Sequence, residues 1–221
     1  MKKAIQITYN NSFEKKCRYA AQAGFQAISV NFNDMTDRSQ AAWEVAPENI
    51  LRILEQNGLS CVQTHLPYYD LRISAEITDD ELEDAIFHSI RVAGAIGAAW
   101  NVYHPRSAVN AGFSATKTLE ENVRRISGYL ETAEKYGTGI ALENLPVFKD
   151  IIPIMPFYPT NSGDLCELAD SFGSKRIGIC WDTGHANLME LNQAESVRQM
   201  GTRLKVTHIH NNFKFYDLHL T

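Results

Sequence analysis

The sequence predicts an α/β fold, a (β/α)8 barrel (TIM barrel) whose eighth strand is missing from this chain. Short apolar runs rich in β-branched and aromatic residues alternate with longer segments of helical periodicity, as in repeated βα units around a parallel sheet. The loop after the first run, Tyr9-Asn10-Asn11-Ser12, lacks the GxGxxG of an open dinucleotide-binding sheet, and the chain has no P-loop. Polar side chains occur at the ends of the apolar runs, where a barrel carries its active site.

The apolar runs are the predicted strands. Each is short and carries β-branched or aromatic side chains, which favour extended backbone. In chain order they cover residues 4–9, 27–32, 60–65, 100–104, 140–143, 177–182 and 204–208.

The segments between them are predicted helices, because apolar residues recur three or four positions apart and charges lie on the opposite face. The first helix is expected to open on Ser12 as its N-cap, and the second to have Pro47 at its first position. The six segments cover residues 12–23, 47–56, 79–97, 115–136, 161–172 and 193–200. No linker rich in proline or glycine interrupts the series.

Length and composition limit the class of protein. We expect residues 1–221 to form a single (β/α) barrel domain, truncated at the C-terminus because a full barrel takes roughly 250 residues. The net charge is −5 and the basic residues are scattered, which disfavours nucleic acid as a partner. No segment approaches the roughly 18 apolar residues of a membrane span, and no signal peptide is recognisable. We therefore expect a cytoplasmic protein that does not bind membranes, and homo-oligomerisation stays open.

The histidines are distributed unevenly. Six of the seven lie at or just after the end of a predicted strand, and only His88 lies within a predicted helix. The six are His65, His104, His185, His208, His210 and His219. Two carboxylates, Glu143 and Asp182, lie at equivalent positions. Because the C-terminal ends of barrel strands converge on one mouth, these side chains are expected to meet there as a divalent metal site.

Each residue also has a structural explanation. A strand-end histidine such as His104, taken alone, is more often hydrogen-bonded for structure. Asp182 could equally cap a helix or form a turn with Thr183-Gly184. Glu143 is harder to explain in this way, because apolar residues flank it and an ionised carboxylate there needs a cation or hydrogen-bond donors. The joint occurrence of these residues at strand ends favours a shared site.

Five strand-end stretches carry a family resemblance. The two most specific are Asp182-Thr183-Gly184-His185-Ala186 and Thr207-His208-Ile209-His210-Asn211. The others are Thr64-His65-Leu66-Pro67, Tyr103-His104-Pro105 and Glu143-Asn144. Together they resemble the xylose isomerase-like TIM barrel superfamily, which holds sugar and sugar phosphate isomerases and epimerases together with the endonuclease IV type of abasic-site nuclease. The resemblance spans nearly the whole chain.

The resemblance implies one divalent metal ion, which could be Mn, Mg, Co or Zn. In the superfamily a Glu, an Asp, a His and a Glu from strands five to eight hold this ion, so that the implied ligands here are Glu143, Asp182 and His208. The fourth ligand, a Glu on the eighth strand, is missing from this sequence. The residues implied to bind substrate are His65, His104 and His185. Further candidates for binding metal or substrate are His210, Asp217 and His219.

These residues favour a metal-dependent sugar or sugar phosphate isomerase or epimerase of carbohydrate metabolism, with a small-molecule sugar as its partner. A metal bound to adjacent sugar oxygens would polarise the carbonyl and acidify the neighbouring C–H, and Glu143 is the candidate base that moves the proton.

Two alternatives stay open. One is a zinc-dependent abasic-site endonuclease, because several residues resemble the additional ligands of a three-zinc cluster in the endonuclease family. These residues are His65, His104, His185, Asp217 and His219. The other is a catalytically silent barrel that binds sugar or metal without turnover.

Overall fold

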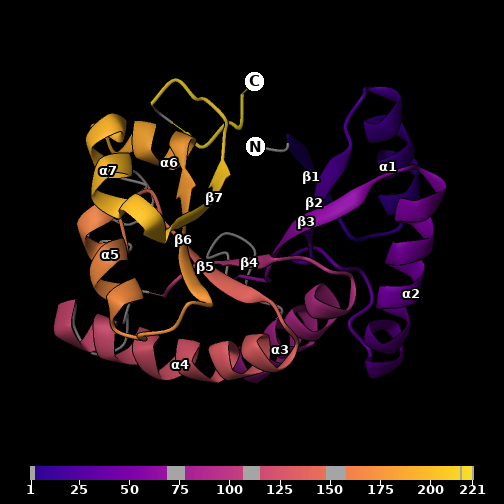
Figure 1. Cartoon of the computed structure of the whole chain (residues 1–221), viewed down its shortest axis with the longest axis horizontal. Coiled ribbons are helices and arrows are strands. Elements are labelled where there is room, and N and C mark those ends of the chain that lie inside the picture. Colours follow the sequence, from indigo (N-terminus) through magenta and orange to yellow (C-terminus); the bar gives the residue numbers. More distant parts are fainter. Residues whose placement is uncertain (1–2, 69–77, 107–114, 148–157, 215, 221) are drawn as a thin grey trace. The chain divides into compact units, whose positions relative to one another are not determined.

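The structure is a computed structural model, shown in Figure 1, and it describes residues 3–68, 78–106, 115–147, 158–214 and 216–220. Contacts within the chain divide it into two compact units. The first unit comprises Met1–Tyr103 and Glu131–Gly139, and the second comprises His104–Leu130 and Ile140–Thr221.

The first unit contains four parallel strands that neighbour one another in chain order. They are β1 (Ala4–Thr8), β2 (Ala27–Asn31), β3 (Ser60–His65) and β4 (Trp100–Tyr103). Every residue of β2 is buried, whereas in β1 only Ile7 is. The β-branched residues Ile28 and Val30 favour extended backbone, which explains why β2 was predictable from sequence although Ser29 and Asn31 are polar.

Three helices follow the first three strands of this unit. They are α1 (Phe13–Gln22), α2 (Gln40–Gln56) and α3 (Asp79–Ala95). Phe32 and Trp43 belong to the core of this unit, with ring centroids 5.7 Å apart. At the start of α3, Thr78 and Glu81 form a capping box, in which each side chain bonds the other's backbone N–H.

One predicted helix start is confirmed and one is wrong. Ser12 is the N-cap residue of α1, as predicted, although its side chain donates to Asn10 Oδ1 at 2.7 Å and makes no cap bond to the helix. The prediction that Pro47 starts the second helix is wrong, because α2 begins seven residues earlier at Gln40, where the Ser39 side chain accepts from the Ala42 N–H. Burial of Trp43, 4% exposed, in the additional turns offsets the cost of a proline within the helix.

The second unit contains the first part of α4 (Ala115–Lys135) and, from Ile140 on, β5 (Gly139–Glu143). The elements that follow are α5 (Ser162–Asp170), β6 (Ile177–Asp182), α6 (Thr183–Leu188), α7 (Gln193–Met200), the 3-10 turn Gly201–Arg203 and β7 (Leu204–His208). The three strands are parallel, and Glu143 pairs with Cys180 while Asp182 pairs with His208. This register brings the C-terminal ends of β5, β6 and β7 to the same edge.

The structure confirms the predicted fold class. In the described residues there are seven strands, each within a residue of its predicted start, and the strands alternate with helices. The short helix α6 was not predicted. None of the helices described here has the length and apolar character needed to cross a membrane.

Candidate metal centre

The three predicted metal ligands lie together at the ends of neighbouring strands. Glu143 ends β5 and Asp182 ends β6, and their side chains are each 1% exposed. His208 ends β7 and places its Nδ1 2.9 Å from Glu143 Oε1 and 3.7 Å from Asp182 Oδ2. The structure therefore brings this trio together within one unit.

Asp182 has a structural role as well. Its Oδ1 accepts the N–H of His185 at 2.7 Å, so that the carboxylate is the N-cap of α6. The buried Asn144 side chain accepts from the Asp182 N–H at 2.7 Å and donates to the Asp182 carbonyl at 3.0 Å. The backbone is thus clamped and one carboxylate oxygen is used for capping, while Oδ2 faces the histidines of the site.

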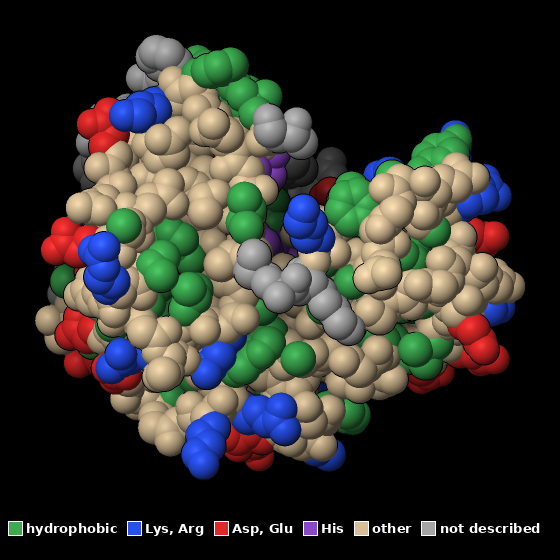
Figure 2. Space-filling model, turned by 45° about the horizontal axis from the view of Figure 1, so that its top comes forward, with side chains coloured by type: hydrophobic (Ala, Val, Ile, Leu, Met, Phe, Trp, Pro, Cys, Tyr) green, Lys and Arg blue, Asp and Glu red, His purple; other side chains and the backbone are tan. Residues whose placement is uncertain are grey.

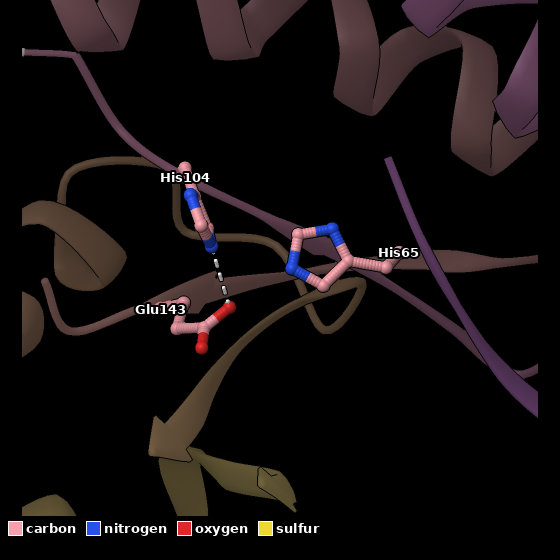
Figure 3. Close-up of side chains that lie close together, drawn as sticks. All are labelled: His65, His104 and Glu143. Atoms are coloured by element: carbon pink, nitrogen blue, oxygen red, sulfur yellow. Dashed lines mark hydrogen bonds and ion pairs between the residues drawn. The ribbon is translucent and has the colours of Figure 1, made fainter. Parts of the chain in front are cut away.

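Glu143 is held through both of its oxygens. Figure 3 shows the His104 ring directed toward Glu143, with His104 Nε2 3.0 Å from Oε2. His208 lies at the other oxygen. The two imidazoles thereby fix the rotation of a carboxylate that is buried from solvent.

His65 ends β3 in the first unit. It is buried, its Nδ1 lies 2.9 Å from the Leu66 carbonyl oxygen, and its ring meets Tyr68 edge-on at 5.3 Å. Its assignment to substrate binding stays a prediction.

A second group of histidines surrounds Asp217. His185 Nε2 lies 3.3 Å and His219 Nε2 3.0 Å from Asp217 Oδ2, while His185 Nδ1 donates to the Asn144 carbonyl at 2.7 Å. His210 links this group to the first, since its Nε2 lies 3.0 Å from Asp182 Oδ2 and 3.7 Å from Asp217 Oδ1. All three further candidates from the sequence, His210, Asp217 and His219, therefore adjoin the three predicted metal ligands or their neighbours.

The electrostatics of the cluster favour ionised carboxylates. Burial alone would raise the pKa of Glu143, but the charges and hydrogen bonds of His208 and His104 hold that pKa well below its ordinary value. The pKa of Asp217 is likewise lowered, because hydrogen bonds from His185 and His219 outweigh its burial.

The histidines show the opposite shift. Burial alone would lower the pKa of His208, but Cys180 and Glu143 raise it well above its ordinary value. Burial would also lower the pKa of His185, yet the hydrogen bond to Asp217 and the charges of Asp182 and Glu143 raise it to about 9. The pKa of His219 is raised chiefly by its hydrogen bond to Asp217. Positive charge is therefore stabilised at His185, His208 and His219.

The donor set fits a divalent cation. Ligand-type atoms approach one another within 4.8 Å in three groups of this unit, two of which share His210. The groups are Glu143, Cys180 and His208; Asp182, His185 and His210; and His210, Asp217 and His219. Carboxylate oxygens combined with imidazole nitrogens suit Mn, Co and Zn, and a bound cation would offset the buried negative charge in place of protons.

Sequence reasoning missed two residues that shape the site. Asn144 was noted only as part of a strand-end stretch, and Cys180 was not singled out as a site residue. Their positions carried a usable signal, because Asn144 directly follows Glu143 and Cys180 lies two residues before Asp182 on the same face of β6. Burial raises the pKa of the Cys180 thiol to about 12.

Comparison with known proteins identifies the family. A family model described as the xylose isomerase-like TIM barrel matches residues 17–220. The chain belongs to this family. The resemblance inferred from the strand-end stretches is therefore confirmed.

Several proteins are similar to this chain in sequence or in structure. The chain is 27% identical over 214 residues to the uncharacterized protein MJ1311 of Methanocaldococcus jannaschii, covering 88% of this chain and 70% of that protein. A D-tagatose 3-epimerase-like protein has a TM-score of 0.75 at 22% identity, with 98% of this chain and 79% of that chain covered. The 3-keto-D-glucoside 4-epimerase YcjR from E. coli has a TM-score of 0.74 at 17% identity, with 96% and 80% covered.

An AP endonuclease of family 2 from Brucella melitensis is also similar, with a TM-score of 0.70 at 18% identity and 94% and 78% of the two chains covered. At these identities the solved structures share the fold with this chain. The activity has to be argued from the site itself.

Proposed function

We propose that this protein is a metal-dependent isomerase or epimerase of a sugar or sugar phosphate. The observation that carries the proposal is the pair of buried carboxylates Glu143 and Asp182, joined by His208 at the ends of three successive strands. Two of the similar solved structures are an epimerase and an epimerase-like protein, which supports this class of reaction.

Glu143, Asp182 and His208 would hold one divalent ion, Mn, Mg, Co or Zn. When bound, such an ion polarises a substrate carbonyl and acidifies the C–H next to it. The ion would replace the protons of the surrounding histidines as the positive charge next to the buried carboxylates, so that no carboxylate is left unpaired.

Glu143 is the proposed base. Its lowered pKa keeps it ionised at neutral pH, which is the state that accepts a proton from carbon. The His104 hydrogen bond to Oε2 restrains the rotation of the carboxylate. His185, whose Nδ1 is tied to the Asn144 carbonyl, presents Nε2 for a hydrogen bond to a substrate oxygen in place of Asp217.

The distribution of charge supports a small substrate. On the face drawn in Figure 2, Lys and Arg side chains are interspersed with Asp and Glu, and the net charge of the chain is −5. A protein that follows a nucleic-acid backbone instead gathers basic side chains along its contact surface.

Deuterium incorporation tests the proposed proton transfer. Ketohexoses and their phosphates would be incubated with the full-length protein and a divalent ion in D2O, and the products analysed by NMR. We expect isomerised or epimerised product with solvent deuterium on the carbon next to the carbonyl. Turnover without deuterium would contradict a carboxylate base, and absence of turnover for every ketose would contradict the isomerase class.

The second candidate is a zinc-dependent abasic-site endonuclease. The specific observation in its favour is Asp217, which lies between His185 and His219 as a further ligand-type group beside the first. The similarity to the Brucella melitensis AP endonuclease supports the same class. Cleavage of an abasic-site oligonucleotide that depends on added zinc would favour this candidate over the isomerase. A silent barrel would do neither reaction.

A further inference from the structure

His210 is a histidine that neither the proposed proton transfer nor the ligand trio uses. It lies two residues after His208, so both side chains leave the same end of β7. Its side chain is 8% exposed and its Nε2 lies 3.0 Å from Asp182 Oδ2. The oxygen that it contacts is the one that Asp182 does not use to cap α6.

The imidazole of His210 is held in place from several directions. The Thr183 hydroxyl donates to the His210 carbonyl at 2.9 Å and lies 3.2 Å from the His210 N–H, which fixes the backbone. The ring of His219 stacks on it with centroids 3.9 Å apart and planes 5° apart. Gly184 lies so close to the ring that a Cβ at this position would overlap it.

The polar bonding of this ring is one-sided. In the part of the chain that the structure describes, His210 Nδ1 is buried and has no hydrogen-bond partner. The contact with Asp182 is therefore the short polar contact that sets the rotation of the ring. Leaving the buried Nδ1 of His210 without a hydrogen bond costs free energy. The bond of Nε2 to the Asp182 carboxylate, which is strengthened by charge, offsets this cost.

We propose that His210 is a positioning residue for Asp182. Oδ1 of Asp182 is held by the N-terminus of α6, and His210 holds Oδ2, so the plane of the carboxylate is fixed before an ion binds. Partners of this kind typically change metal affinity without touching the ion. The inference rests on the proposed function, because it takes Asp182 to be a metal ligand.

Substitutions at His210 test this role in the full-length protein. His210→Met removes the donor and keeps an apolar side chain of similar size, whereas His210→Gln keeps an amide N–H that can reach Asp182. We expect the Met variant to bind Mn²⁺ roughly 10- to 100-fold more weakly, measured by the EPR signal of free Mn²⁺, and the Gln variant to recover most of this loss. Cys166→Ser on α5 is the control, with unchanged affinity expected.

Gly184→Ala tests the same positioning by changing the residue against which the His210 ring packs. The added methyl group would displace the His210 ring, so we expect a similar loss of Mn²⁺ affinity. The double variant Gly184→Ala with His210→Met should lose little more than either single variant, because both remove one interaction. Circular dichroism and thermal unfolding identify any variant that fails to fold, and if either His210→Met or Gly184→Ala does, the other decides the question.

Several results would overturn the proposal. Wild-type Mn²⁺ affinity in folded His210→Met would show that Asp182 needs no help from this residue. A Co²⁺ absorption spectrum that changes its coordination pattern in His210→Gln would make His210 a direct ligand. If the wild-type protein binds no divalent ion, the proposed function fails together with this inference, whereas wild-type binding with unaffected variants contradicts the inference alone.

Discussion

At the scale of single residues, the geometry of Asp182 is compatible with both roles that the sequence left as alternatives, helix capping and the proposed metal ligation. Its Oδ1 caps α6 through the His185 N–H at 2.7 Å, and its Oδ2 faces His210 at 3.0 Å. A carboxylate has two oxygens with separate hydrogen-bonding directions, so capping and ligation do not compete. Capping instead restrains the carboxylate that the site uses.

The histidine pKa values predict that ion binding is coupled to proton release. In the metal-free protein His185 has a pKa of about 9 and the pKa of His208 is raised, so both carry protons at pH 7. A cation bound by His208 requires this imidazole to be neutral, so its proton must leave. We expect metal affinity to rise with pH from about 6 upward, and calorimetry in buffers of different ionisation enthalpy to detect the released proton. Affinity independent of pH in this range would contradict the prediction.

The same shifts set the pH dependence of the metal-free fold. A histidine whose pKa is raised on folding stabilises the protein fully below its unfolded pKa, near 6.5, and this contribution is lost as pH rises through the folded value. For His185 the loss falls between about 6.5 and 9. We therefore expect metal to restore stability most strongly at the alkaline end.

At the residue level, the sequence predicted that Glu143 has polar partners, and the structure places His104 and His208 beside it. Glu143 could be identified because a carboxylate within Ala-Leu-Glu-Asn-Leu-Pro needs a partner to offset its burial. The role of His210 could not, because it depends on how one ring lies against Gly184 and His219. Sequence spacing does not determine such ring placement.

At the scale of elements, Asn144 joins the ends of β5 and β6. Its side chain is fully buried and makes two hydrogen bonds to the Asp182 backbone, at 2.7 and 3.0 Å. The backbone hydrogen bonds between β5 and β6 stop where the strands end, and the Asn144 side chain continues the connection by one more residue, next to the site. Asn144 thus holds the backbone of Asp182 in place, as His104 holds the side chain of Glu143.

Asn144→Ala tests this connection. The substitution leaves the Asp182 N–H and carbonyl buried without these partners, and we expect the free energy of unfolding in urea to fall by about 2 to 4 kcal/mol. Asn57→Ala is the matched control, because its partly exposed amide makes one bond, to the Ile53 carbonyl, and should cost less than ~1 kcal/mol. Equal losses in the two variants would contradict a special role for Asn144.

The elements themselves were predictable to different degrees. All seven strands follow from short runs with β-branched or aromatic residues, which favour extended backbone whether the strand is buried, as β2 is, or largely accessible, as β1 is. The start of α2 was missed because Pro47 is a common first helical residue, whereas Ser39 provides the cap here. The six residues of α6 include Gly184 and are too few to show helical periodicity.

At the scale of the whole molecule, the family and the βα order agree with the sequence prediction. The substrate does not follow from them, because family members of the same fold differ in the reaction they catalyse and activity depends on the site. In this chain the proposed site combines Glu143, Asp182 and His208, which lie close together, with the adjoining group His210, Asp217 and His219. The candidate functions differ in the number of bound ions, which is one for the isomerase and about three for the endonuclease.

Metal analysis of the purified full-length protein is the most direct test of the central claim. Inductively coupled plasma mass spectrometry should find one divalent ion per wild-type chain, and essentially none in Glu143→Gln, because this change removes a charged ligand and the base together. The variant should also have no isomerase activity. About three zinc ions per wild-type chain would favour the endonuclease, and a wild-type chain without metal, or a fully active Glu143→Gln, would contradict the account.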